Sequence, residues 1–185
     1  MHRTTIEVKA RCSDPDAVRN TMHSRNARYA GLDRQVDTYF RVDSGRLKLR
    51  EGTIERFLIH YDRRDGNGPK QSNVILYEVE PDSSLKEILA RSLGIRTVVV
   101  KQREIYFIGN VKFHIDRVEN LGSFVEIEAI DSDGSIGTDR LGAQCRQYIE
   151  LLGISQDDFI TSSYSDMLDS PGAGYDRAIV ETGRI

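Results

Sequence analysis

The stretch Arg46-Leu47-Lys48-Leu49-Arg50 alternates cationic with apolar side chains. Successive side chains of a β-strand point to opposite faces, so this stretch predicts a strand with one cationic face and one apolar face. Ser44-Gly45 before it and Gly52-Thr53 after it have the composition of hairpin turns. The stretch is therefore predicted to be one arm of a hairpin in an antiparallel sheet.

The same period of two recurs in 5–11, 111–116 and 125–129, where charged residues alternate with apolar ones. Gly109-Asn110 and Asn120-Leu121-Gly122 supply further turn signals. Together these patterns predict eight strands, at 3–12, 33–42, 45–52, 55–64, 72–80, 96–108, 111–119 and 123–131. Strands joined mostly by hairpins indicate an antiparallel sheet that can close on itself.

Three segments have helical periodicity, at roughly 14–28, 84–93 and 138–152, each with an apolar stripe. Ser13 with Asp16 and Ser84 with Glu87 have the spacing of capping boxes. Glycines that follow these segments are typical helix stops. The three stripes need an apolar partner, and the strands supply one on a single face.

Two interpretations account for the charged strand faces. The ordinary one is a sheet whose outer face contacts water. The other is a barrel whose apolar faces look outward, beneath the helices, and whose charged faces line the lumen. Sorting of charge by strand favours the second, because cations fill 46–50 and 101–103 while carboxylates concentrate at 126–128. An eight-stranded barrel is wide enough for side chains or one small ligand.

Cations outnumber carboxylates on the proposed lumen faces. The cations are Lys9, Arg11, Arg46, Lys48, Arg50, Arg63, Lys101, Arg103 and Lys112, against Glu7, Asp116, Glu126 and Glu128. Buried charge needs compensation, so we expect a compact polyanion such as a triphosphate in the lumen. The clustered carboxylates beside it suit Mg²⁺ or Mn²⁺.

The overall composition excludes several classes of protein. The chain has 185 residues with a formal net charge of −3, which is typical of one soluble domain and not of a general nucleic-acid binder. Neither a membrane helix nor a signal peptide is apparent, and Cys12 and Cys145 stand apart without a metal-binding motif. We expect a cytoplasmic protein, with no nucleic acid or membrane as partner; a homodimer is an open alternative.

The order of several short motifs resembles the CYTH superfamily of triphosphate tunnel metalloenzymes, and most closely its class IV adenylyl cyclase-like members. The resemblance covers residues 4–168 and predicts a domain at 1–168 followed by a poorly ordered tail at 169–185. It rests on Thr5-Ile6-Glu7-Val8-Lys9, Gln35 to Phe40, Arg46 to Glu51, Lys101-Gln102-Arg103, His114 to Asp116, Leu121 to Glu128 and Tyr164 to Leu168.

The resemblance implies an α+β fold, an eight-stranded antiparallel β-barrel with a charged lumen that about three helices cover outside. It also implies roles for individual residues. Phosphate would bind to Lys9, Arg46, Lys48, Arg50, Arg63, Lys101 and Arg103. A divalent metal, Mg²⁺ or Mn²⁺, would bind to Glu7, Asp116, Glu126 and Glu128. A Lys9–Tyr39 pair would assist deprotonation of the nucleophile, although barrel packing explains Tyr39 equally well.

Thr5 departs from the family motif Glu-x-Glu-x-Lys, in which a carboxylate stands first. Three functions therefore stay open. The first is a metal-dependent cyclase that converts ATP to cyclic AMP and pyrophosphate. The second is a triphosphatase acting on inorganic tripolyphosphate or an organic triphosphate such as thiamine triphosphate. The third is a module that binds nucleotide or polyphosphate without turnover, which the loss of the carboxylate at Thr5 favours.

Overall fold

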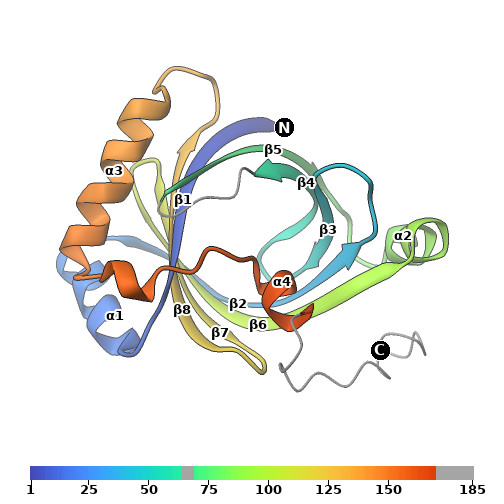
Figure 1. Ribbon diagram of the computed structural model, residues 1–185, viewed down its shortest axis with the longest axis horizontal. Helices are drawn as coiled ribbons and strands as arrows, with labels where there is room; N and C mark the ends of the chain where they lie inside the picture. Colours follow the sequence, from blue (N-terminus) through green and yellow to red (C-terminus); the bar gives the residue numbers. More distant parts are fainter. Residues whose placement is uncertain (64–68, 170–185) are drawn as a thin grey trace.

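The computed structural model of the chain describes residues 1–63 and 69–169, without the side chain of Arg63. Its strands form one closed antiparallel barrel in the order β1-β5-β4-β3-β2-β6-β7-β8, with β8 paired to β1 (Figure 1). The strands are β1 (His2–Arg11), β2 (Arg28–Phe40), β3 (Arg46–Glu51), β4 (Arg56–Arg63), β5 (Lys70–Glu78), β6 (Ile95–Ile108), β7 (Val111–Val118) and β8 (Gly122–Asp131). The predicted α+β fold with an eight-stranded barrel is confirmed.

All eight strands lie where the alternation predicts them, and most bounds differ by one or two residues. The exception is β2, which begins at Arg28 instead of residue 33. Its first residues pair with the end of β6 beyond a register shift between Tyr29 and Gly31, and Gly31 has φ +131°. This irregularity interrupts the alternation, which is why the pattern did not mark the first residues as strand.

The helices are α1 (Pro15–Ser24), α2 (Leu85–Leu93), α3 (Thr138–Leu151) and the short α4 (Tyr164–Asp169). Helices α1 and α3 pack on the outside of β1, β7 and β8 (Figure 1). Buried apolar side chains such as Phe113, Ile127 and Leu141 fill this layer. The largest core therefore lies outside the barrel wall, as the inside-out arrangement requires.

Helix α2 differs from the other two predicted helices, because none of its residues is fully buried. It stands beside the barrel (Figure 1), and Ile88 remains 57% exposed. The outer face of β4 and β5 is open as well, with Ile75 and Tyr77 exposed. The helices thus cover one side of the barrel more fully than the other.

The caps of the helices differ from those that the sequence suggests. Asp14, not Ser13, caps α1: its Oδ1 accepts a hydrogen bond from the amide of Ala17 at 3.0 Å. Ser84 precedes α2 without a side-chain cap, although Gly94 ends that helix with φ +74°. Helix α1 stops at Ser24, four residues earlier than predicted, because β2 begins at Arg28.

A segment between α3 and α4 crosses one end of the barrel. After the 3₁₀ turn Gln156–Asp158, the amide of Ile160 donates to the carbonyl of Lys9, and Lys70 donates to the carbonyl of Thr161. Helix α4 then lies against β6. The pattern did not predict this six-residue helix, which is too short to display a full periodic stripe.

The buried carboxylate of Asp33 holds the turn between β3 and β4 in place. Asp33 accepts hydrogen bonds from the amides of Ile54 and Glu55 and from the hydroxyl of Thr53, at 2.9–3.0 Å. A Cβ at Gly52 would lie 2.7 Å from both Asp33 carboxylate oxygens and 2.6 Å from the carbonyl oxygen of Glu55. Only glycine fits there without a backbone shift.

Of the predicted tail at 169–185, only Asp169 belongs to the described residues. None of the helices within residues 1–63 and 69–169 has the length and apolar character needed to span a lipid bilayer.

We expect Gly52→Ala to lower the free energy of unfolding by about 1–3 kcal/mol, because the new Cβ meets fixed backbone and a carboxylate. Gly142→Ala in α3 is the matched control, since its Cβ would meet the flexible Arg146 guanidinium at 3.4 Å and Ile6 Cδ1 at an ordinary contact distance of 3.8 Å, and alanine would favour the helix. Urea unfolding of both variants checks this. Equal stability of the two variants would contradict the close approach at Gly52.

Candidate functional site

The barrel encloses a cavity of about 370 Å³ whose wall is rich in charge. Every strand contributes to the lining, because alternate residues of each strand face inward. The charged lining residues are Arg3, Lys9, Lys48, Arg50, Lys101, Arg103 and Lys112, together with Glu7, Asp37, Glu55, Glu126 and Glu128. The charged faces therefore converge inside the barrel.

Asp37 of β2 is the centre of one charge cluster. Its carboxylate accepts hydrogen bonds from Lys48 at 3.0 Å, from two nitrogens of Arg50 at 2.9 Å each, and from Lys101 at 2.6 Å. Register pairing places Arg50 directly opposite Asp37. Burial alone would raise the pKa of Asp37, but Arg50, Lys101 and Lys48 together hold it well below its usual range. Asp37 therefore stays ionised and fixes three cations in place.

Lys101 is the most deeply buried of these cations, with 1% of its side chain exposed. Burial lowers the pKa of Lys101 to about 7, against the attraction of Asp37, and the nearby Arg50 and Arg103 act in the same direction as burial. The ammonium group of Lys101 therefore titrates near neutral pH, unlike an ordinary lysine.

Glu55 lies in the wall of the cavity, beside this cluster. Asp33 positions the turn that carries it, and the Glu55 carboxylate accepts hydrogen bonds from Arg50 at 3.0 Å and from Lys112. Burial would raise the pKa of Glu55, but Lys112 and Arg50 hold it well below its usual range. Arg50 thus spans two carboxylates, Asp37 and Glu55.

A second cluster surrounds Arg103 of β6. Its guanidinium donates to both oxygens of Asp116, at 2.7 and 2.5 Å, and to Glu126 at 2.8 Å. Asp116 also accepts from the hydroxyl of Tyr164 at 2.8 Å, so α4 contributes a residue to the interior. Asp116 is buried behind Arg103 and is not among the residues that line the cavity.

His114 and Lys9 complete the surroundings of Glu126. The Nδ1 atom of His114 lies 3.1 Å from Glu126, and the Lys9 ammonium lies 3.7 Å from it. Burial lowers the pKa of His114 to about 4, with Arg103 and Lys112 contributing. His114 is therefore neutral at physiological pH, and Lys9 also stacks 3.9 Å above the centre of the Tyr164 ring.

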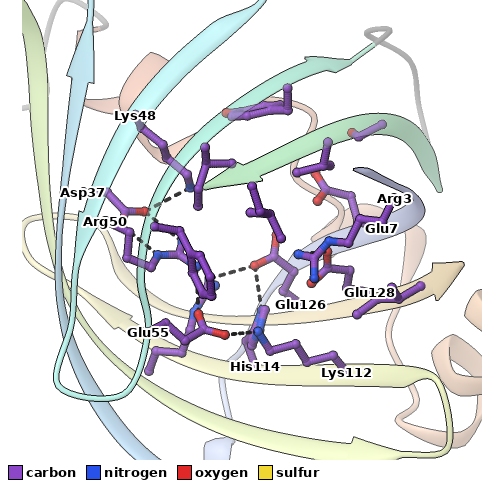
Figure 2. A pocket seen from close by; sticks show the side chains of 18 of the residues that line it. Arg3, Glu7, Asp37, Lys48, Arg50, Glu55, Lys112, His114, Glu126 and Glu128 are labelled. Carbon is purple, nitrogen blue, oxygen red and sulfur yellow. Dashed lines mark hydrogen bonds and ion pairs between the residues drawn. The ribbon is translucent and has the colours of Figure 1, made fainter. Parts of the chain in front are cut away.

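A third group, Arg3 with Glu7 and Glu128, lies at another part of the wall (Figure 2). Arg3 donates to Glu128 at 3.2 Å, and Glu7 stands opposite Glu128 in the β1–β8 register. These residues face the Asp37 cluster across the cavity, with Glu126 between the two groups (Figure 2). The carboxylates are thus spread over the wall and alternate with cations.

This distribution reduces the expected excess of cations, from nine against four carboxylates to seven against five. Asp37 and Glu55 add two carboxylates that the lumen count did not include, whereas Arg11 is exposed and lies over the ring of Phe124. The inference that only a ligand can compensate the buried cations is therefore wrong. Carboxylates of the chain already pair with most of them.

The predicted phosphate-binding residues fall into three groups. Those that line the cavity are Lys9, Lys48, Arg50, Lys101 and Arg103. Arg46 lies outside the cavity lining, and its guanidinium donates to Asp166 of α4 at 2.9 Å. Arg63 ends β4 opposite Ser72, and its side chain lies outside the described part of the chain.

Lys9 and Tyr39, which the resemblance pairs, contact other residues in this structure. Lys48 is the lysine beside Tyr39, with 3.4 Å between its ammonium and the phenol oxygen, whereas Lys9 lies over Tyr164. Burial raises the pKa of Tyr39, and Asp37 adds to this effect. Tyr39 therefore keeps its proton at neutral pH.

Sequence reasoning missed three charged residues of the site. Asp37 lies in the predicted strand 33–42, where Arg41 on the same face offsets its charge, so this strand did not stand out as charged. Glu55 was missed because it directly follows a turn, and Arg3 was missed because it stands at the predicted start of β1. An extension of the β1 alternation from Lys9 back through Glu7 and Thr5 to Arg3 would have found the last of these.

The predicted metal ligands Glu7, Glu126 and Glu128 line the cavity, and Asp116 does not. Within residues 1–63 and 69–169, no three acidic, histidine or cysteine side chains gather closely enough to form a complete metal site. Arg3 and Arg103 explain this, because each pairs with a carboxylate of the predicted set.

Comparisons with known proteins agree with this barrel. A protein of Methanocaldococcus jannaschii described as a "putative adenylate cyclase" is 25% identical over 171 residues, which cover 88% of this chain and 97% of that protein. A solved structure from Pyrococcus horikoshii has a TM-score of 0.74 at 25% identity, and covers 88% of this chain and 98% of its own.

A Hippeastrum protein described as a "putative adenylyl cyclase" with a dominant triphosphatase activity shares the fold. Its TM-score is 0.57 at 13% identity, over 89% of this chain and 93% of its own. The model of the CYTH domain matches residues 3–164, which is nearly the whole of the described barrel. The chain therefore belongs to the CYTH domain family.

Proposed function

We propose that the chain binds a triphosphate in the tunnel and transfers its phosphoryl or nucleotidyl group. The observation that carries this proposal is the convergence of seven lysine and arginine side chains on one enclosed cavity. Triphosphate is a compact polyanion of the right size and charge for such a cavity. On binding, its oxygens would take over hydrogen bonds that Asp37, Glu55 and Glu126 accept in the free protein.

Two of the three arginines that line the cavity, Arg50 and Arg103, are suited to bind phosphate oxygens. Arg50 and Arg103 are planar forks already oriented by bidentate carboxylate pairs, with Asp37 and Asp116. Lys9, Lys48 and Lys101 would add point charges between them. Catalysis by such a site rests on position and on stabilisation of developing charge, because phosphoryl transfer asks little covalent chemistry of the protein.

A divalent metal, Mg²⁺ or Mn²⁺, fits the donor set that lines the cavity. Glu7, Glu126 and Glu128 offer hard carboxylate oxygens, and they would hold the ion. The lack of a complete three-residue cluster in the described chain is compatible with this role, because Mg²⁺ usually takes one or two carboxylates together with substrate phosphates. When bound, the metal would neutralise phosphate charge and lower the pKa of the nucleophile.

Within the chain itself, Lys9 and Tyr39 are the proposed catalytic side chains. Lys9, near Glu126, would stabilise the nucleophile as it loses its proton. Tyr39 holds its own proton because its pKa is raised, so it would donate a hydrogen bond to a phosphate oxygen rather than act as a base. Arg46 at the edge of the barrel would join the phosphate site if Asp166 released it.

Two reactions are compatible with this arrangement. In the first, the ribose 3′-hydroxyl of ATP attacks the α-phosphorus and pyrophosphate leaves, which is the cyclase reaction named in the description of the Methanocaldococcus relative. In the second, water attacks the terminal phosphorus and orthophosphate leaves. Incubation with ATP, tripolyphosphate and thiamine triphosphate, each with Mg²⁺ or Mn²⁺, separates them. Cyclic AMP identifies the first reaction and orthophosphate the second.

A third candidate is a binding module without turnover. Two observations favour it. Position 5 holds a threonine where the family motif has a carboxylate, and Arg103 and Arg3 already pair with Asp116 and Glu128. Submicromolar to micromolar binding with neither product would identify it. If none of the three triphosphates bound or reacted, the proposed function would be wrong.

We expect Arg50→Ala to weaken tripolyphosphate binding by about tenfold to a hundredfold, because hydrogen bonds to charged groups contribute about 1.5–3 kcal/mol each. Isothermal titration calorimetry measures the affinity. Arg91→Ala in α2 is the control. It removes the same charge, but the side chain of Arg91 is 80% exposed to solvent, so the affinity should be unchanged. An equal effect of both variants would mean that only net charge matters.

We expect Glu128→Gln to reduce metal-dependent turnover by at least about a hundredfold, since even indirect partners of a metal are worth 10–100-fold. Binding of tripolyphosphate in EDTA should persist, because the substitution removes a negative charge from the wall. Glu150→Gln on the exposed side of α3 is the control. Unchanged metal-dependent rates in Glu128→Gln would remove Glu128 from the metal site.

The lowered pKa of Lys101 leads to a pH-dependent prediction. At pH 8 the free protein holds Lys101 mostly neutral, because its pKa is about 7. A bound polyanion favours the charged form, so binding should take up a proton at pH 8 and not at pH 5.5, where Lys101 is already charged. Calorimetry in two buffers of different ionisation enthalpy measures the uptake.

The substitution Lys101→Met isolates this contribution from protons of the ligand itself. We expect the variant to take up fewer protons than the wild type at pH 8 and the same number at pH 5.5. Equal proton uptake by the two proteins at pH 8 would show that Lys101 is charged before the ligand arrives.

A further inference from the structure

One side of the cavity wall carries no charge among the described residues. The neighbouring strands β4 and β5 contribute to the lining, in this part of the chain, the side chains of Phe57, Ile59, Tyr61, Ser72, Val74 and Leu76, which we call the β4–β5 wall. Ile59, Val74 and Leu76 are buried there as an apolar cluster separate from the outer core. The charged lining residues come from the other strands and from the β3–β4 turn. The cavity therefore has a charged side and an apolar side.

The apolar side extends to the end of the barrel that lies away from the segment between α3 and α4. That segment contacts Lys9, near the end of β1, and Lys70, the first residue of β5. Met1 and Leu76 line the cavity at the opposite ends of these two strands, where their backbones pair. Met1 is 71% exposed, so this end of the cavity reaches solvent. We call it the open end.

The charge of the lining suits a head group smaller than tripolyphosphate. Seven cations against five carboxylates leave an excess of two cations. Buried charge is stable only when it is balanced. In the absence of a metal, this excess matches the charge of a diphosphate ester more closely than that of the more highly charged inorganic tripolyphosphate. The volume of about 370 Å³, which is within the range of small-molecule sites, leaves room for an organic group beside the phosphates.

The β4–β5 wall indicates the chemistry of that organic group. Its two hydroxyl groups belong to Tyr61, opposite Val74 in the register, and to Ser72, so both stand farther from the open end than Ile59 and Leu76 do. A nucleobase on the outer part of the wall would lose water from its polar edges without gaining a hydrogen-bond partner there. A hydrocarbon chain has no such cost, and its burial is favourable.

We propose that the tunnel binds an aliphatic ester of diphosphate, with the phosphates among the lysines and arginines and the hydrocarbon chain along the β4–β5 wall towards the open end. This inference rests on the proposed function, because it assumes that the cations bind phosphate oxygens. It goes beyond that function by assigning Phe57, Ile59 and Leu76 to an apolar subsite, which inorganic tripolyphosphate has no surface to fill.

Isothermal titration calorimetry in EDTA tests this with inorganic diphosphate, isopentenyl diphosphate and geranyl diphosphate, which carry no, one and two isoprene units. We expect the affinity to rise about tenfold with each unit, because burial of each methylene contributes several-fold and ordering of the chain offsets part of the gain. ADP presents the same diphosphate on a polar nucleoside and should bind more weakly than geranyl diphosphate. Tripolyphosphate should displace geranyl diphosphate, because both need the same cations.

One variant with a matched control locates the chain. Leu76→Ala removes part of the β4–β5 wall, so it should weaken geranyl diphosphate by about tenfold and leave inorganic diphosphate unchanged. Tyr77→Ala alters the next residue along β5, which is 67% exposed and does not line the cavity, and should change neither affinity. Equal weakening of both ligands by Leu76→Ala would contradict the apolar subsite.

Equal affinities of the unaltered protein for the three diphosphates would overturn this inference, and tripolyphosphate binding would then leave the proposed function intact. Tighter binding of ADP than of geranyl diphosphate would also overturn it. So would geranyl diphosphate that tripolyphosphate cannot displace, since that ligand would lie on an exposed apolar residue such as Ile88. Failure of tripolyphosphate and all the diphosphates to bind would overturn the proposed function as well. The comparison of ligands needs no variant, so it stands even if Leu76→Ala does not fold.

Discussion

Charge compensation inside the barrel is the constraint on which the rest of the structure depends. A closed barrel whose apolar faces point outward buries the charged side chains of its lumen. A buried cation without a partner would lose its proton, because burial lowers its pKa, or would destabilise the fold. Asp37 compensates the charges of Lys48, Arg50 and Lys101 on one part of the wall. Asp116 and Glu126 do the same for Arg103. These carboxylates let the free protein exist with a cationic tunnel.

The same pairing organises the site for a ligand. Carboxylates orient the guanidinium groups of Arg50 and Arg103 before any phosphate arrives, so little side-chain entropy remains to be lost on binding. Asp33 extends this order to the β3–β4 turn, where it fixes Glu55. Tyr164 of α4 extends it to the far end of the barrel through Asp116. Fold and site therefore share one network of hydrogen bonds, and the barrel wall is also the binding surface.

Alternation alone predicted the eight strands, the closed antiparallel sheet and the inward side of residues such as Lys48, Arg50 and Lys101, because a period of two assigns each side chain to a face. It could not predict partners across the lumen, such as Arg50 with Glu55, because those depend on how the strands close around the axis. The backbone irregularity at Gly31 interrupts the alternation at the start of β2, and α4 is too short to show a helical period. The resemblance contributed roles for Lys9 and Tyr39, whose contacts in the structure are with Tyr164 and Lys48.

The most direct test of a cationic tunnel that exchanges its internal carboxylates for phosphate is a crystal structure with a slowly hydrolysed triphosphate analogue and Mn²⁺, whose anomalous signal locates the metal. We expect phosphate oxygens within hydrogen-bond distance of Arg50, Lys101 and Arg103, and the metal beside Glu128. An analogue bound to the outside of the barrel, with the Asp37 and Glu126 clusters still closed on themselves, would contradict it.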